Sequence, residues 1–448
     1  MEYRTLDDLN RLAEDDRAAL LGLAGLGLPT SNSHLARVMA GTRGFPQAQA
    51  WAANPRLLQE RLLRLQGLGL AETTRQGYWV CAEPALESAA RMAFAQGVLG
   101  RLHQGAVTGT GHGAVLPEAR MRCRAELRLA FLEGSHQRWL PLRQRFEQQF
   151  GDTIRHRDPL GLICGGPFEP VWFETLDPAA QAYGCQALLL DQALHGLRSR
   201  AFLDWMEIQA ATPRATPSAL PLMLFLILQG RSAELGAWKA AQPAGTRNGY
   251  AWPALEALEA LAAGQPARAA DRFGQSLARL EQASGRRAAL LPGLYEPFHI
   301  LALLALRDPR ARERTLLLAR RDPQDPMPAA LHRLGQSLAG IPLPPPKPRV
   351  TPNTVLNLFM EALGAYLGGE PLAPEQPDRL LRACAPLPLG WFAKELLELR
   401  NRLQGQPARP SPLLDLVPQQ APWERALASL RRLGQDRPPA PMEKPGKH

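Results

Sequence analysis

Residues 255–273 read LEALEALAAGQPARAADRF, and this stretch decides the fold class. Leucine recurs every third residue up to Leu261, which is the spacing of an apolar stripe along an α-helix. Gly264 and the following Gln-Pro then interrupt the pattern. An alanine-rich run with Ala270 and Phe273 comes next. The stretch therefore predicts two helices joined by a tight turn, with small residues where the helices cross.

This helix pair resembles one tetratricopeptide-type repeat, with Gly264 at its turn. A helix pair cannot bury its apolar face alone, so neighbouring pairs must stack on it. The surrounding sequence holds further runs of helical length separated by short turns, but these lack the same signature. We predict a degenerate tetratricopeptide-like array over residues 216–340, with helices at 220–228, 233–241, 254–263, 267–281, 295–306 and 311–320.

Residues 1–92 follow a different plan. Leucines at helical spacing over 6–23 are followed by Gly25 and Gly27, and a serine-capped helix is expected at 34–40. Asn54 and Pro55 are a good capping pair for a third helix. Two short extended runs then flank the polar turn at Arg75–Gly77 and predict a β-hairpin. Three helices followed by a hairpin is the order of a winged helix, so we predict a winged-helix-like head.

The third helix would be the recognition element of such a head. Its opposite face and the hairpin tip offer side chains to a DNA groove. Winged helices also serve as protein-docking modules, so DNA contact and protein docking both stay open. We expect the leucines Leu57, Leu58, Leu62 and Leu65 to face the core, and the DNA-contact candidates are Arg56, Gln59, Arg61, Arg64 and Arg75.

Arginine supplies nearly all of the formal charge of +10, and the pI is about 9.8. Its guanidinium matches phosphate in fork geometry, which makes double-stranded DNA a candidate partner. Arginines spread along the chain are equally typical of an ordinary solvated surface. Arg120, Arg124 and Arg128 lie four residues apart, so they form one basic stripe if residues 118–132 are helical. The stripe could grip phosphates or simply face solvent.

The remaining segments complete the expected domain plan. Residues 93–215 predict a helical domain in which 151–170, rich in glycine and proline, forms an irregular loop. The proline-rich run 341–350 predicts an extended spacer that breaks the array. A C-terminal helical segment is expected over 351–434, with a last short helix at 421–430. Residues 435–448 predict a disordered tail.

No pattern for catalysis stands out. The sequence holds no phosphate-binding P-loop and no spacing of His or Cys that favours a metal, so we expect no enzyme, no cofactor and no metal in this chain. Its five cysteines are scattered, which indicates buried free thiols in a reducing cytoplasm. We expect a cytoplasmic location without membrane contact, because no signal peptide or spanning run is evident.

One further stretch has a distinctive order. The helix containing Phe273 ends in a basic, glycine-containing turn, and Leu-Pro-Gly at 291–293 precedes an aromatic, leucine-rich helix. This order resembles the N-terminal helical region of bacterial Swi/Snf-type (DEAD/DEAH-box) helicase-like ATPases, most specifically over residues 255–306. Pro422-Trp423-Glu424-Arg425 also resembles the segment before a linker in that family. The family's motor, with its Walker A and Walker B boxes, is missing from this sequence.

The resemblance implies no catalytic or nucleotide-binding residue in this chain. It implies a non-catalytic regulatory or docking region that works with a Swi/Snf-type DNA-dependent ATPase, encoded in the same chain or another. Its partners would be a protein, such as that motor, and in one reading double-stranded DNA. The residues leave two alternatives open: a winged-helix transcriptional regulator with a partner-sensing array, and a purely protein-binding adaptor.

Overall fold

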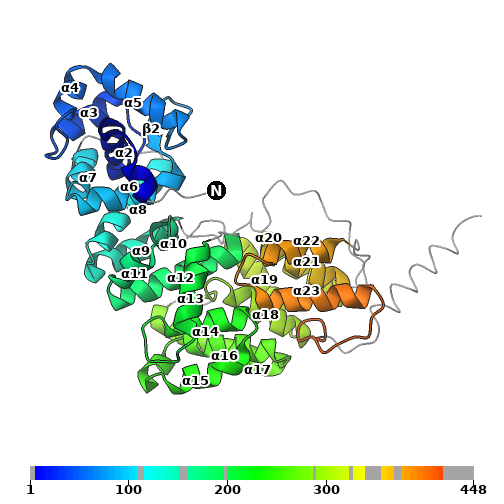
Figure 1. The fold of residues 1–448 in the computed structure, drawn as a ribbon. Coiled ribbons are helices and arrows are strands. Elements are labelled where there is room, and N and C mark those ends of the chain that lie inside the picture. The colour runs from blue at the N-terminus through cyan, green and yellow to red at the C-terminus, as the bar shows by residue number, and fades with distance from the viewer. Residues whose placement is uncertain are drawn as a thin grey trace, which may run out of the picture. The chain divides into compact units, whose positions relative to one another are not determined.

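A computed structural model of the chain is mainly α-helical, as the sequence predicts (Figure 1). Across the described residues it holds 23 α-helices and one two-stranded antiparallel hairpin. The chain divides into two compact units, residues 1–192 with 197–222 and residues 193–196 with 223–448. The structure describes residues 6–108, 116–150, 159–195, 199–285, 289–321, 326–338, 355–367 and 375–416.

The first unit begins with the elements that the sequence predicts, with one helix divided. The leucine-rich run 6–23 forms two helices, α1 (Leu6–Asn10) and α2 (Glu14–Leu26). Gly27 ends α2 in the left-handed conformation, with φ 62°, whereas Gly25 lies inside the helix. Ser31 caps α3 (Asn32–Ala40) by accepting a hydrogen bond from the His34 N–H. The short helix α4 (Ala48–Ala53) follows.

Helix α5 (Pro55–Gly67) is the predicted third helix, and Asn54 caps it as expected. Leu58, Leu62 and Leu65 are fully buried. Leu57 is 40% exposed, so the prediction that it faces the core is wrong. The reason is helical geometry, since adjacent residues differ by about 100° around the axis and Leu58 takes the inward position.

The hairpin pairs β1 (Ala71–Thr73) with β2 (Trp79–Cys81), in the register Thr73 to Trp79. Thr30, in the connection between α2 and α3, also pairs with Trp79 through two backbone hydrogen bonds of 2.8 and 2.9 Å. A third extended position therefore joins the hairpin to the helices. Figure 1 shows these strands grouped with α2 to α5.

Helix α6 (Glu83–Ala95) follows the hairpin directly, so the expected boundary at residue 92 falls inside a helix. The rest of the first unit is helical, and α8 confirms the helix predicted over 118–132. These elements are α7 (Leu99–Thr108), α8 (Leu116–Leu132), α9 (His136–Phe150), α10 (Pro159–Gly165), α11 (Pro170–Glu174), α12 (Pro178–His195) and α13 (Arg200–Ala210).

The expectation of an irregular loop over 151–170 is wrong for α10, every residue of which is buried. Its glycines permit close packing rather than breaking the helix. A Cβ atom on Gly161 would lie 2.7 Å from the Asp191 carboxylate of α12. Arg91 stabilises the end of α10, because its guanidinium donates to the carbonyl oxygens of Ile163 at 2.6 Å and Cys164 at 3.2 Å. Residues 151–158 lie outside the described part of the chain.

All six helices predicted between 220 and 320 are confirmed, with small shifts in their bounds. Gly264 forms the turn of the central pair with φ 68°, and Phe273 is fully buried. The run at 233–241 begins as a short 3-10 turn, Ser232–Glu234. The helices are α14 (Ala219–Leu228), α15 (Leu235–Ala240), α16 (Ala251–Ala262), α17 (Pro266–Ser284), α18 (Tyr295–Ala305) and α19 (Arg310–Arg321), and a second 3-10 turn is Ala244–Asn248.

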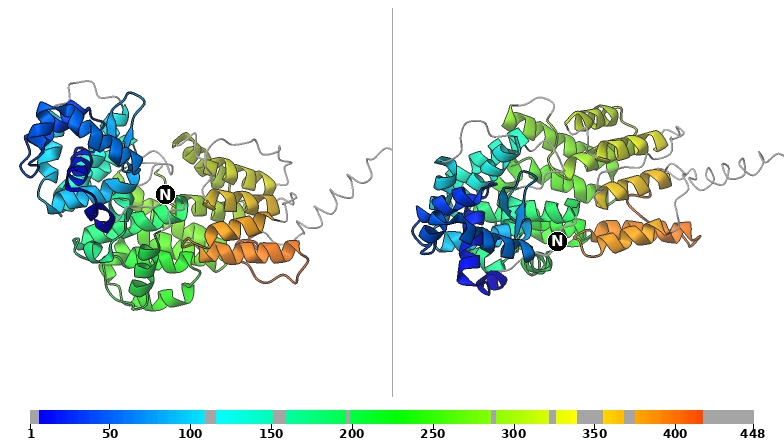
Figure 2. Two further views of the ribbon diagram at one scale, coloured as in Figure 1. Left: turned by 45° about the horizontal axis from the view of Figure 1, so that its top comes forward. Right: turned by 90° about the horizontal axis from the view of Figure 1, so that it is seen from above.

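The helical array continues past the proline-rich run 341–350, so the prediction that this run breaks it is wrong. Helices α20 (Pro326–Leu338) and α21 (Val355–Leu367) pack closely, and a Cβ atom on Gly364 would lie 3.4 Å from Leu334 Cα. Helices α22 (Gln376–Cys384) and α23 (Gly390–Leu403) extend the row (Figure 2). The helix expected at 421–430 and the tail at 435–448 lie outside the described residues.

The prediction of buried free thiols holds for four of the five cysteines. All five cysteines are free, four of them buried and Cys81 half-buried. Aromatic residues fill the core, with Phe168 at 5.2 Å from both Phe173 and Phe202. Among the helices that the structure describes, none is long and apolar enough to cross a membrane.

Candidate functional site

The predicted DNA-contact face of α5 is partly occupied by the protein's own carboxylates. Arg61 lies 3.0 Å from Asp15, and Arg64 lies 3.3 Å from Asp16. Both aspartates belong to the acidic first turn of α2, where negative charge also suits the helix dipole. These arginines therefore hold α5 against α2, and their charge is already compensated within the fold.

Arg56, Gln59 and Arg75 remain exposed, as the sequence predicts. Arg75 lies in the turn between the strands, where Thr74 and Tyr78 exchange two hydrogen bonds of 2.8 and 3.1 Å. Within the described part of the chain, neither Arg56 nor Arg75 has an ion-pair partner. Of the arginines predicted to contact DNA from the head, only Arg56 and Arg75 are therefore without a carboxylate partner among the described residues.

Apolar side chains accompany them on the same helix and hairpin. Leu63 is 52% exposed on α5, Leu68 is 47% exposed just after it, and Tyr78 is 42% exposed in the hairpin turn. Gln66 links the two elements by donating to Thr73 at 3.4 Å. We call the four exposed side chains the head surface: Leu57, Leu63, Leu68 and Tyr78. The sequence analysis did not identify this exposed apolar set. Its leucines on α5 lie outside the buried stripe of Leu58, Leu62 and Leu65, and that position indicates exposure.

The head also lacks the excess of positive charge that duplex DNA requires. Residues 6–95 carry nine arginines and nine carboxylates, so their formal net charge is zero. Nonspecific DNA binding depends on many unpaired cations facing phosphates. The overall charge of +10 therefore resides outside the head.

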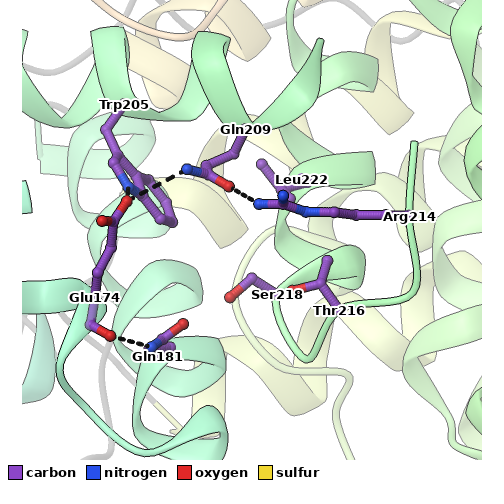
Figure 3. A pocket seen from close by; sticks show the side chains of 8 residues that line it. All are labelled: Glu174, Gln181, Trp205, Gln209, Arg214, Thr216, Ser218 and Leu222. Carbon is purple, nitrogen blue, oxygen red and sulfur yellow. Dashed lines mark hydrogen bonds between the residues drawn. The ribbon is translucent and has the colours of Figure 1, made fainter. Parts of the chain in front are cut away.

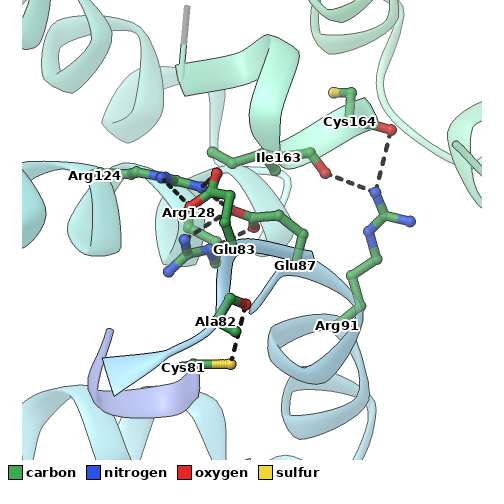
Figure 4. A network of polar contacts seen from close by, with 9 residues as sticks. All are labelled: Cys81, Ala82, Glu83, Glu87, Arg91, Arg124, Arg128, Ile163 and Cys164. Carbon is green, nitrogen blue, oxygen red and sulfur yellow. Dashed lines mark hydrogen bonds and ion pairs between the residues drawn. The ribbon is translucent and has the colours of Figure 1, made fainter. Parts of the chain in front are cut away.

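The second predicted DNA-contact set, on α8, divides between surface and interior (Figure 4). Arg128 is buried and binds Glu87 with both nitrogens, at 2.6 and 2.8 Å. Arg124 donates to Glu87 at 2.7 Å and to Glu83 at 3.0 Å. The prediction that these two arginines form an exposed basic stripe is wrong, because α6 covers them with carboxylates. Arg120 remains exposed at the start of the stripe.

This network lowers the pKa of Glu87, the buried carboxylic acid at its centre. Burial alone would raise the pKa of Glu87, but the charges and hydrogen bonds of Arg128 and Arg124 outweigh it and lower the pKa to about 2. Glu87 therefore stays ionised at neutral pH. Bidentate arginine–carboxylate pairs of this kind fix geometry strongly, so the network joins α6 to α8 and serves structure rather than ligand binding.

No group of three or more His, Cys, Asp or Glu side chains is placed to hold a metal ion in the parts of the chain that the structure describes. Comparisons with protein-family models, curated proteins and solved structures found no match.

Proposed function

We propose that this chain is a non-catalytic docking scaffold that works with a Swi/Snf-type DNA-dependent ATPase. In this proposal the first unit carries a winged-helix-like head that binds a protein partner, and the second carries a tetratricopeptide-like array. A cytoplasmic location belongs to the same proposal, in keeping with five free thiols.

The head surface is the observation that carries the proposal. Exposed leucine and tyrosine side chains on one helix and its adjoining hairpin favour burial against another protein. Tyrosine is also enriched where interfaces form. The neutral formal charge of residues 6–95 fits such a partner better than it fits a polyanion.

The array supports the same proposal in a second way. Helix pairs stacked in a row present extended surfaces, which repeat proteins use to bind other proteins. The link to a motor rests on the sequence resemblance of residues 255–306 alone. It names the partner to test, namely the Swi/Snf-type ATPase of the same genome.

The experiment measures binding of the full chain to that ATPase by isothermal titration calorimetry. We expect a complex that Leu63→Glu weakens at least about tenfold, because a charge would be buried in the interface. Phe94→Glu is the matched control, since Phe94 is 38% exposed on α6 and lies outside both the head surface and the array. Absence of a complex would contradict the proposal, as would ATP turnover by this chain that a single substitution abolishes.

A second candidate function is DNA binding by the head. The pairing of Thr30 with Trp79 favours it, because a winged helix places a third extended segment beside its hairpin. Binding would then use Arg56, Gln59 and Arg75. Fluorescence anisotropy with a labelled duplex at low salt tests it: Arg75→Ala should weaken binding and reduce its salt dependence, whereas Leu63→Glu acts on protein docking. No duplex binding at low salt leaves the head as a protein-docking module.

A further inference from the structure

The first unit also contains a cleft of about 400 Å³ (Figure 3). Helices α11, α12 and α13 supply one side, and the segment that leads from α13 into α14 supplies the other. Polar side chains dominate its lining, with Leu222 buried at its base. The lining residues are Glu174, Gln181, Trp205, Gln209, Arg214, Thr216, Ser218 and Leu222.

Glu174 and Arg214 bring one charge of each sign to the lining of this cleft, and Arg214 donates a hydrogen bond to the Gln209 amide oxygen (Figure 3). The Glu174 carboxylate accepts hydrogen bonds from the Trp205 indole N–H at 2.9 Å and from the Gln209 amide at 3.4 Å. Both donors are neutral, and Glu174 has no ion-pair partner among the residues that the structure describes. The carboxylate is thus held in place by neutral donors and can pair with a cationic group on a ligand.

Ser218 provides the strongest sign of a missing partner. Ser218 is 3% exposed, and its hydroxyl oxygen has no hydrogen-bond partner within the described structure. A buried hydroxyl without a partner destabilises a fold, so a ligand that supplies one gains a favourable contact. Figure 3 shows this hydroxyl pointing into the cleft.

Gln181 adds an acceptor nearby. Its amide nitrogen donates to the main-chain oxygens of Glu174 at 3.1 Å and Leu176 at 2.8 Å. The amide oxygen then faces the cleft (Figure 3). Together, Ser218 and Gln181 offer a hydroxyl and an amide oxygen, which match the alternating N–H and C=O groups of an extended main chain.

The helices that wall the cleft also carry the two most exposed large apolar side chains of the described structure. Val171 on α11 is 81% exposed, and Ile208 on α13 is 71% exposed. Such side chains favour contact with apolar groups of a partner. A free cation or a small polar metabolite would leave them uncovered, whereas a peptide can cover them.

We infer that this cleft binds an extended peptide segment of a partner protein. A lysine or arginine of the peptide pairs with Glu174, its main chain meets Ser218 and Gln181, and its apolar side chains cover Val171 and Ile208. The inference rests on the proposed docking function and gives that function a second, peptide-binding site.

The probe is a phage-displayed library of random dodecapeptides selected on the full chain. Enriched peptides are then synthesised with a fluorescent label, and their Kd values are measured by anisotropy. We expect a lysine or arginine in the enriched sequences. Glu174→Gln should weaken binding about tenfold, and so should a glutamate in place of that basic residue. Glu207→Gln, on the same helix as Gln209, is the matched control and should leave the Kd unchanged.

Ser218→Ala separates a binding role from a structural one. We expect weaker peptide binding together with an unchanged or higher melting temperature, because the variant removes an unpaired buried hydroxyl. A lower melting temperature with unchanged Kd would show that Ser218 serves only the fold and would overturn its assignment to the site.

Two other outcomes would overturn the inference as a whole. One is a library that yields no enriched sequence. The other is a set of enriched peptides whose binding survives both Glu174→Gln and Ser218→Tyr, the latter of which fills the cleft. If those peptides instead lose binding with Leu63→Glu, the cleft is excluded while docking by the head surface stands. Loss only with the cleft variants supports the cleft even where the head surface binds nothing.

Discussion

The ion pairs between α2 and α5 and those between α6 and α8 look alike in sequence but differ in burial. In each region two arginines on one helix meet carboxylates on another. Arg61 and Arg64 keep 31% and 58% of their side chains exposed, whereas Arg128 and its partner Glu87 each keep only 3%. In the first region water reaches both arginines and Asp15, and only Asp16 is buried, at 4% exposed, whereas in the second region both Arg128 and Glu87 are closed to water.

The role of each arginine therefore depends on the helix that packs opposite it. The sequence predicts phosphate contact in both regions, from the recognition-helix position of Arg61 and Arg64 and from the four-residue spacing of Arg124 and Arg128. Because exposed pairs contribute little and a broken buried pair leaves an uncompensated charge, the two regions should respond very differently to substitution.

The largest effect is expected for Arg128→Met. This change leaves Glu87 buried with only the partly exposed Arg124 beside it, and should lower the free energy of unfolding of the first unit by about 3 kcal/mol. Urea unfolding measures the loss, and hydrogen exchange of α6 and α8 amides assigns it to this region. The double variant Glu87→Leu/Arg128→Met should recover most of it, because both charges leave together. A loss below about 1 kcal/mol for Arg128→Met would contradict the expectation that the buried pair contributes more to stability than the half-exposed pairs.

The buried pair of Glu87 and Arg128 should also make the stability of the fold depend on pH. The pKa of Glu87 falls from 4.5 to about 2 on folding, so the folded chain binds this proton less readily than the unfolded chain. Its contribution to stability, up to about 3 kcal/mol, is therefore fully present above pH 4.5 and is lost as the pH falls toward 2. The free energy of unfolding as a function of pH should show a shallower decline below pH 4.5 in Glu87→Gln. Parallel curves would contradict this role.

The smallest effects are expected in the half-exposed region. Arg61→Ala and Arg64→Ala should each lower the free energy of unfolding by less than about 1 kcal/mol, and 1 M NaCl should reduce the effect further. Both arginines approach Asp16, at 3.8 and 3.3 Å, so each can partly replace the other. The double variant should then cost more than the sum of the two, and strict additivity in urea unfolding would contradict this shared role.

Local sequence features predicted most of the helices and their ends. Asn54 before Pro55 predicted the start of α5 correctly, because caps depend on groups within one turn of chain, whereas the helix expected from residue 34 begins two residues earlier, at Asn32. The irregular loop expected at α10 failed for the opposite reason. Glycines at 161 and 165 look like breakers in isolation, but they permit close approach of α12 once the helix is covered.

The candidate sites were harder to predict. Arg56, Gln59 and Arg75 are exposed as expected, but the apolar head surface beside them was not foreseen. The cleft joins residues from 174 to 222 that share no motif, and its main sign, the unpaired hydroxyl of Ser218, is a property of packing.

The helical class, the hairpin and the turn at Gly264 follow from the sequence alone, because they depend on neighbours along the chain. Only the tertiary structure decided which arginines are neutralised, whether the helix row continues beyond residue 350, and which polar groups are left unpaired. Those outcomes depend on which helix packs opposite a residue. Charge pairing and burial across helices act at a distance in sequence that no local pattern encodes.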